Sequence, residues 1–377
     1  MGAAIRYRGR LKDGARIEDL EDRVVQVALE VGGETHIHPT DLRLERGGFN
    51  ILLGTTRAGK TTLMHLMAGL ERPSAGQVWF EGRDVTGVSV RRRNVAMVHQ
   101  QFINYPSLSV FENIASPLRV ARMARDEIDR RVREAADLLK LTPMLGRRPD
   151  ELSGGQQQRT AIARALVKDA DLVLLDEPLA NLDYKLREEL REELPRLFEA
   201  KGAVVVYATT EPSEALLLAG HTATLHEGRV TGFGPTGELY RAPGDLLTAQ
   251  VFSEPPINLA LVEKRGSRVA LAHDGAALAE WEAPAALAGA ADGAYTMGLR
   301  PHFVQPVNGG GLPEVEGRVL VTELSGSESV AHFELAGQPW VAQAHGIHPF
   351  EVGLTARFAL ETGRAFYFDG AGRRVGS

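Results

Sequence analysis

The sequence predicts an α/β domain followed by a smaller all-β domain, and three patterns indicate this fold class. An apolar strand at residues 49–53 leads through a glycine-rich turn into an apolar helix at 60–70, as in α/β phosphate-binding units. Residues 172–178 and 203–210 are apolar runs that predict strands buried on both faces, as in parallel sheets. After Pro243 the chain consists of short alternating segments separated by glycines and prolines, which favours a small β-barrel or a pair of barrels.

Length and composition limit what the protein can be. Its 377 residues, 44% hydrophobic and 24% charged, suit two or three globular domains. The net charge of −6 argues against nucleic acid as the main partner. There is no cysteine, so disulfides, thiolate metal sites and cysteine nucleophiles are excluded. No apolar run approaches the ~18–20 residues of a membrane span, and none forms a secretory signal, so we expect a soluble, cytoplasmic protein that reaches a membrane only through partners.

We expect three segments along the chain: an N-terminal extension at 1–22, the α/β domain at 23–240 and the C-terminal β-barrel domain at 241–377. The first segment is polar and broken by glycines, whereas strand patterns begin at Arg23. The further elements predicted are strands at 24–31 and 41–45, a charged helix at 125–140, a helix with a leucine stripe at Leu186, Leu190, Leu194 and Leu197 that kinks at Pro195, a hairpin at 222–234, and surface loops at 276–291 and 309–311.

A phosphate-binding motif lies between the strand at 49–53 and the helix that follows it. Residues 54–61 fit the pattern Gly-x4-Gly-Lys-Thr in the strand–turn–helix context that this motif requires. Successive backbone N–H groups and the helix dipole would bind the phosphates, Lys60 would reach the β- and γ-phosphates, and the Thr61 hydroxyl would ligate Mg²⁺. Arg57 stands where such loops often carry glycine, and we expect an unstrained φ and a solvated side chain there. The alternative is an ordinary glycine-rich turn. The candidate binding residues are Gly54, Thr55, Thr56, Arg57, Ala58, Gly59, Lys60, Thr61 and Thr62.

An acidic pair, Asp176 and Glu177, ends the apolar strand that begins at Leu172. Neighbouring parallel strands end at one edge of a sheet, so this pair can meet the phosphate loop there. Asp176 would hold Mg²⁺, directly or through water, and Glu177 would polarise the attacking water. The alternative is that the pair caps the next turn.

Between these two motifs lies Leu152-Ser-Gly-Gly-Gln-Gln-Gln-Arg159. Together with the phosphate loop and the acidic pair, this segment resembles the signature of ABC-type ATPases, and the resemblance covers roughly residues 23–235. A serine, two glycines and an amide at a helix N-terminus also make a second anion site. The resemblance implies ATP and Mg²⁺ as cofactors and a dimer in which the signature of one subunit closes on the ATP of its mate. The signature residues are Ser153, Gly154, Gly155 and Gln156.

Further residues follow from the same resemblance. Gln100 stands where the family has a glutamine that touches Mg²⁺ and the attacking water, so the implied Mg²⁺ ligands are Thr61, Gln100 and Asp176. The stretch 102–114 resembles the surface that receives a helix of a membrane subunit. Asp183 matches an aspartate that crosses the dimer interface.

The C-terminal segment resembles the OB/TOBE-like regulatory barrels of maltose-type and glycerol-phosphate-type importer ATPases, through Met297–His302 and Val321–Glu328. The resemblance implies the ATP-hydrolysing subunit of a sugar or polyol importer, peripheral on the cytoplasmic face of the membrane. The implied partners are membrane-spanning permease subunits and, indirectly, a solute-binding protein. The segments Leu179–Asp183 and Phe102–Pro106 look closest to the glycerol-transporting branch, which favours glycerol or glycerol phosphate as the solute.

Two positions depart from the family pattern. Thr210 occupies the place of the switch histidine, which in the family reaches the γ-phosphate and stabilises the geometry of hydrolysis. We predict that Thr210 instead caps the helix that begins at Glu211-Pro212, which is compatible with a lost catalytic role. Val31 stands where the family stacks an aromatic ring on adenine, so adenine binding should be weaker or partly supplied by other residues. The candidate catalytic positions are therefore Glu177, Gln100 and Thr210.

An intact signature beside a missing histidine leads to a hypothesis about assembly. We expect this chain to pair with a different ATPase subunit that has the histidine, in a heterodimer rather than a homodimer. The alternative is a subunit that binds nucleotide and clamps the dimer with little hydrolysis. ABC ATPases of DNA repair or of the ribosome need long coiled-coil insertions or tandem ATPase units, and this chain has neither.

Overall fold

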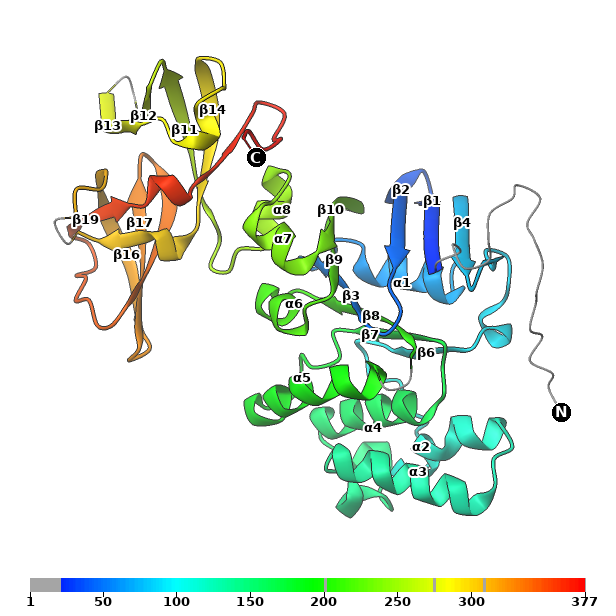
Figure 1. Ribbon diagram of the computed structural model, residues 1–377. Helices are drawn as coiled ribbons and strands as arrows, with labels where there is room; N and C mark the ends of the chain where they lie inside the picture. The colour runs from blue at the N-terminus through cyan, green and yellow to red at the C-terminus, as the bar shows by residue number, and fades with distance from the viewer. Residues whose placement is uncertain (1–21, 200–201, 274–275, 308–309, 377) are drawn as a thin grey trace. The chain divides into compact units, whose positions relative to one another are not determined.

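The computed structural model describes residues 22–199, 202–273, 276–307 and 310–376. The chain divides into two compact units, with the boundary between Thr236 and Gly237 rather than at the predicted 240/241 (Figure 1). Residues 1–21 of the predicted extension lie outside the described residues, and Asp22 is already the first residue of β1. No described helix is long and apolar enough to cross a membrane.

A mainly parallel sheet forms the centre of the first unit. Its strand order is β10-β9-β3-β8-β7-β6, and only β10 runs antiparallel to its neighbour. Every residue of β3, β7 and β8 is buried, which confirms the prediction of strands covered on both faces. The strands are β3 Phe49–Gly54, β6 Val95–Val98, β7 Leu172–Asp176, β8 Val204–Thr209, β9 His221–His226 and β10 Arg229–Pro235.

A second, antiparallel sheet covers the helix that follows the phosphate loop. The strand order is β2-β1-β4-β5, and β2 is one long strand that includes residues 41–44 of the segment predicted at 41–45. Apolar side chains of this sheet, of α1 and of the parallel sheet form one core. The elements are β1 Asp22–Val31, β2 Glu34–Leu44, β4 Ala75–Phe80, β5 Arg83–Asp84 and α1 Lys60–Ala68.

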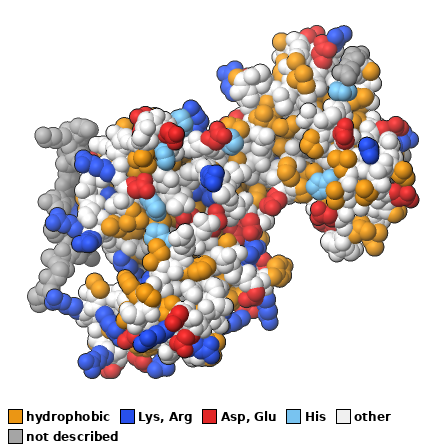
Figure 2. All heavy atoms as spheres, turned by 180° about the vertical axis from the view of Figure 1, so that it is seen from behind, with side chains coloured by type: hydrophobic (Ala, Val, Ile, Leu, Met, Phe, Trp, Pro, Cys, Tyr) orange, Lys and Arg blue, Asp and Glu red, His pale blue; other side chains and the backbone are white. Residues whose placement is uncertain are grey.

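The helices α2, α3 and α4 pack together on one side of the parallel sheet (Figure 1). The predicted apolar stripe of α3 is buried from Ile128 to Ala136, while its outer face carries ion pairs such as Glu127–Arg130. Figure 2 shows basic and acidic side chains mixed over these helices, as expected of a solvated face. α5 runs unbroken through Pro195. The helices are α2 Val110–Val120, α3 Arg125–Leu138, α4 Gly154–Val167, α5 Tyr184–Glu199 and α6 Pro212–Leu218.

The second unit contains two five-stranded antiparallel sheets around a shared aromatic core, which confirms the predicted all-β domain. Phe333 stacks on Phe358 with ring centroids 3.9 Å apart. The helices are α7 Thr236–Arg241, which begins at the boundary, and α8 Leu246–Val251. The strands are β11 Asn258–Arg265, β12 Arg268–His273, β13 Ala276–Glu282, β14 Gly293–Leu299, β15 Val304–Pro306, β16 Glu314–Leu324, β17 Glu328–Leu335, β18 Gln338–His345, β19 Thr355–Leu360 and β20 Phe366–Phe368.

The prediction of a surface loop at 276–291 is wrong. Its first part is β13, which pairs with β12 along its length, and Trp281 and Leu287 are buried in the core. Alanine is not enriched in strands, so an alanine-rich sequence gives little sign of one. Pairing with β12 and burial of Trp281 stabilise the strand at 276–282. Of the predicted loop at 309–311, Gly310 and Gly311 lie outside the strands and are exposed.

Candidate functional site

The phosphate loop lies between β3 and α1, and two of its positions accept only glycine. Gly59, the N-cap of α1, has φ +102°, and a Cβ there would lie 2.9 Å from Ile37 Cδ1. A Cβ on Gly54 would lie 2.5 Å from the carbonyl oxygen of Leu225. The backbone of the loop can therefore pack closely against neighbouring strands directly before α1.

Lys60 is folded into the loop. Its ammonium donates to the carbonyl oxygens of Gly54 at 2.7 Å and Thr55 at 3.0 Å, and lies 3.4 Å from Glu177 Oε1. The side chain is 5% exposed. Burial lowers the pKa of Lys60, although the neighbouring carboxylates Glu177 and Asp176 act against this shift. The cation is thus held where an incoming phosphate could replace Glu177 as its counter-ion.

Arg57 differs from the prediction in one respect. Its side chain is exposed, as expected, but its φ is +68°, in the left-handed region, where an unstrained φ was predicted. Such loops often have glycine at this position, and glycine adopts a positive φ easily. The turn keeps this left-handed conformation in the present chain, so Arg57 has a positive φ.

We expect Arg57→Gly to stabilise the first unit by about 0.5–1 kcal/mol. A left-handed residue with a Cβ costs ~1–2 kcal/mol, and the greater freedom of glycine in the unfolded chain offsets part of that gain. Thermal unfolding of the nucleotide-free chain measures the effect. The matched control is Arg57→Ala, which removes the charge but keeps the Cβ and should give no gain. An equal gain from alanine would assign the effect to charge instead of backbone strain.

Thr61 and Asp176 form the part of the site that fits a divalent cation. Thr61 Oγ1 donates to Asp176 Oδ2 at 2.8 Å, and Asp176, the last residue of β7, is buried. No group of three or more His, Cys, Asp or Glu among the described residues could hold a metal ion. Mg²⁺ needs no such cage, because it is held by one or two protein oxygens together with substrate phosphates and water. The hydroxyl–carboxylate pair beside the phosphate loop therefore fits Mg²⁺.

Glu177 is held from two sides. Gln100 Nε2 donates to its Oε2 at 2.9 Å, and Lys60 faces its Oε1. The backbone of Glu177 has φ +47°, so the chain turns sharply directly after β7. This turn brings the carboxylate, together with Gln100 from the loop after β6, toward the start of α1.

A cleft of about 480 Å³ opens at this place. Its lining includes Lys60, Gln100 and Glu177, together with residues that the sequence analysis missed: Glu34, Thr35 and His36 of β2 and the turn residues Glu227 and Gly228. A Cβ on Gly228 would lie 2.3 Å from the carbonyl oxygen of His36, so the β9–β10 turn touches β2. In the sequence, Gly228 within the hairpin predicted at 222–234 was the signal that another part of the backbone could approach this turn closely. Val31, at the end of β1, is exposed and does not line the cleft. The lining residues from the motifs are Thr56, Arg57, Ala58, Gly59, Lys60, Thr61, Thr62, Gln100 and Glu177.

The signature segment begins α4 and is separate from this cleft. Ser153 is the N-cap: it accepts from the backbone N–H of Gln156, whose side chain accepts from the N–H of Ser153. Ser153 and Gly154 are exposed, and a Cβ on Gly155 would lie 3.2 Å from the carbonyl oxygen of Asn181. Asp183 is exposed and accepts from the N–H of Leu186 at the start of α5. An exposed, capped helix N-terminus is therefore available to a second molecule.

The prediction that Thr210 caps α6 is wrong. The helix begins at Pro212 with Glu211 as its N-cap, and no side chain caps it. The hydroxyl of Thr209 accepts from the N–H of Glu211 at 3.0 Å and donates to Glu214 Oε2 at 2.6 Å. Thr209 is the buried last residue of β8 and points inward, whereas Thr210 is exposed at the bend after the strand. Thr210 therefore has no local structural role that explains its presence.

Together, the phosphate loop, the Thr61–Asp176 pair and the exposed signature helix define an ATPase of the ATP-binding cassette class, which binds ATP with Mg²⁺. The ABC transporter family matches residues 37–180. The sn-glycerol-3-phosphate import ATP-binding protein UgpC of Rhizobium meliloti is 36% identical over 90% of this chain and 95% of its own. The trehalose/maltose import ATP-binding protein MalK of Thermococcus litoralis is 34% identical over 92% and 97%. The chain belongs to the ABC transporter family, among its ATP-binding proteins.

A solved structure agrees with the fold of the first unit. The ATP-binding cassette MJ0796, a dimer in a post-hydrolysis state bound to ADP and Pi, superimposes with a TM-score of 0.53 and 28% identity. The match covers 57% of this chain and 98% of the cassette.

Proposed function

We propose that the chain is the ATP-binding subunit of an ABC importer for a sugar or polyol, with glycerol or glycerol phosphate favoured as the solute. The observation that carries this is the cleft in which Lys60, Thr61 and Glu177 meet. In it, the loop N–H groups and Lys60 would bind the phosphates, and Thr61, Asp176 and Gln100 would hold Mg²⁺. Glu177 would orient the attacking water. The names of the import relatives support the transported class.

The membrane partner would bind near residues 102–114. Ile103 and Tyr105 are 55% and 51% exposed, although both are large and apolar. Beside them lies a hollow of about 210 Å³ whose lining includes Tyr105, Val120 and Arg164. An exposed apolar patch with a polar rim suits a protein partner, and we assign it to the membrane-spanning permease subunits. The subunit would then sit peripherally on the cytoplasmic face of the membrane and meet a solute-binding protein only indirectly.

We further propose that the second ATPase of the transporter is a different chain, which has the switch histidine. Thr210 is exposed, lacks a capping role and cannot carry charge, so the site of this chain lacks one stabilising group. The signature residues Ser153–Gln156, in contrast, keep a complete helix cap that the partner's ATP could use. Hydrolysis in the heterodimer would occur mainly at the partner's site.

Phosphate release by the isolated chain and by Glu177→Gln tests whether this site hydrolyses ATP. We expect slow but measurable release by the parent and a fall to the assay background in the variant, because the substitution removes the carboxylate that orients water. Equal rates for the two proteins would instead favour a subunit that binds ATP and clamps the dimer without hydrolysis. ATP binding by the variant, measured by calorimetry, is the control for an intact loop.

A further inference from the structure

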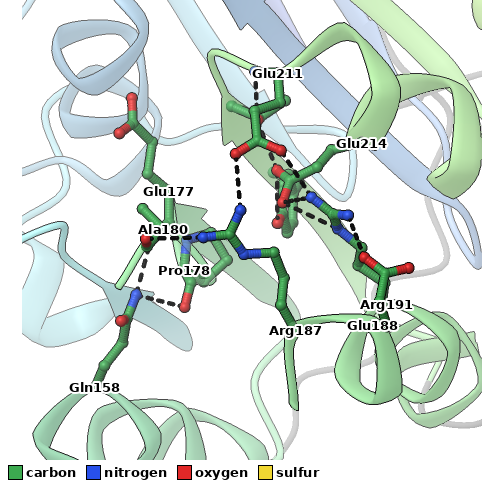
Figure 3. A network of polar contacts seen from close by, with 11 residues as sticks. Gln158, Glu177, Pro178, Ala180, Arg187, Glu188, Arg191, Glu211 and Glu214 are labelled. Carbon is green, nitrogen blue, oxygen red and sulfur yellow. Dashed lines mark hydrogen bonds and ion pairs between the residues drawn. The ribbon is translucent and has the colours of Figure 1, made fainter. Parts of the chain in front are cut away.

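Arg187 of α5 connects two segments that are far apart in the sequence, and Arg191 of the same helix supports one of them (Figure 3). Arg187 Nη2 donates to the carbonyl oxygen of Ala180 at 3.1 Å, in the loop after Glu177. Its Nη1 lies 3.2 Å from Glu211 Oε1, in the residue directly after Thr210. One guanidinium therefore joins the loop that precedes Asp183 to the segment that carries the switch position. We call residues 179–183 the D segment and residues 209–214 the switch segment.

The switch segment is held at further points. Arg191 Nη2 lies 2.7 Å from Glu211 Oε2 and 2.9 Å from Glu214 Oε1. The other oxygen of Glu214 accepts from Tyr207 and Thr209 of β8. Glu214 is only 6% exposed, so this carboxylate is a buried anchor. Arg191 is thus a second support for the switch segment, and none of its ion pairs among the described residues is with the D segment.

The two residues directly before the D segment are held from the signature helix. Gln158 of α4 donates to the carbonyl oxygens of Glu177 at 3.3 Å and Pro178 at 2.5 Å. Polar contacts thus run from Gln158 of α4 to residues 177 and 178, and from Ala180 through Arg187 to Glu211. Arg187 Nε is buried without a hydrogen-bond partner, so the guanidinium accepts an unfavourable placement while making both other contacts.

We propose that Arg187 is a positioning residue that fixes the D segment and the switch segment relative to each other. A planar guanidinium can bond a carbonyl and a carboxylate at once in a fixed geometry, which a lysine ammonium does not reproduce. Loss of this contact should loosen both segments together, although they are far apart in the sequence. The switch position is then pre-formed even though threonine occupies it, so a histidine introduced there would be held in place.

Amide hydrogen exchange of the full chain tests the connection without reference to hydrolysis. The reporters are the hydrogen-bonded N–H groups of Ala180 and Leu182 in the D segment and of Glu211 in the switch segment. We expect Arg187→Gln to accelerate exchange about tenfold in both segments, and Glu211→Gln to accelerate exchange in the D segment, to which Arg187 links Glu211. Arg187→Lys should give an intermediate effect.

The matched control is Arg196→Gln on the same helix, where the arginine is 74% exposed and lies 3.5 Å from Glu193. It should leave exchange in both segments unchanged. If Glu211→Gln leaves the D segment at its original rate, the two segments are independent and the proposal is overturned. The proposal also fails if Arg187→Gln affects one segment alone. If Arg187→Gln folds poorly, Glu211→Gln still tests the connection between the two segments.

A second experiment measures ATP hydrolysis; it rests on the proposed function, and its result is independent of the hydrogen-exchange result. In a Thr210→His background, adding Arg187→Gln should lower kcat about tenfold with KM for ATP changed by less than about twofold, whereas adding Arg196→Gln should not. If the increase in kcat caused by Thr210→His is unchanged when Arg187→Gln is added, the positioning role of Arg187 is overturned. A histidine variant with no gain at all would count against the degenerate switch in the proposed function, and the exchange data would still decide the role of Arg187.

Discussion

Replacing Thr210 with histidine is expected to raise the ATP turnover of the isolated chain by about 10²-fold, because one contact to developing charge in a transition state is worth ~10²–10³ in rate. The parent chain offers a short hydroxyl that cannot be protonated, whereas imidazole reaches further and can carry charge. The substitution should fold well, since Thr210 is exposed and its neighbour Thr209 makes the hydrogen bonds of this turn.

Phosphate release against pH measures this expectation. The gain should vary between about pH 6 and 7 as the imidazole titrates, and the parent should lack that inflection. Thr210→Gln, which has a similar length without a ring, is the control for size. Robust turnover by the parent chain, unaffected by the histidine, would contradict the view that its switch is degenerate.

Much of the fold could be predicted because the relevant signals are local. The apolar runs at 172–176 and 204–209 and the motif at 54–61 each lie within a few consecutive residues, and a parallel sheet brings their ends together by its geometry. The pairing of Thr61 with Asp176, which are far apart in the sequence, follows from that edge.

Three of the failures have a common cause, which is that the deciding contact is remote in the sequence. Whether Thr209 or Thr210 turns inward depends on where β8 ends and on the buried acceptor Glu214. The strand at 276–282 depends on pairing with β12. The part of the cleft formed by β2 and the turn at 227–228 depends on the contact of Gly228 with His36, for which no spacing rule exists.

The ATP site of this chain departs from the family pattern, whereas its signature segment keeps every residue of that pattern. This difference determines how the chain could contribute to the two ATP sites of a dimer. The phosphate loop carries a strained Arg57, and the switch position lacks a histidine. Ser153 and Gln156, in contrast, satisfy each other's polar groups and leave the helix N-terminus open. Substitutions in this chain should therefore affect the two ATP sites of a heterodimer unequally.

In the transporter complex, purified through a tag on this chain, Ser153→Arg should lower ATP hydrolysis by ~10²–10³-fold, because the bulky side chain blocks the anion site that seals the partner's ATP. Glu177→Gln in the same chain should lower it by less than about twofold, since the proposed pairing places most hydrolysis at the partner's site. In a homodimer each site would contain both residues, and the two substitutions would be equally severe. Ser153→Thr, which keeps the helix cap, controls for loss of folding. Hydrolysis that falls as steeply with Glu177→Gln as with Ser153→Arg would place catalysis equally in both sites and exclude the asymmetric pair.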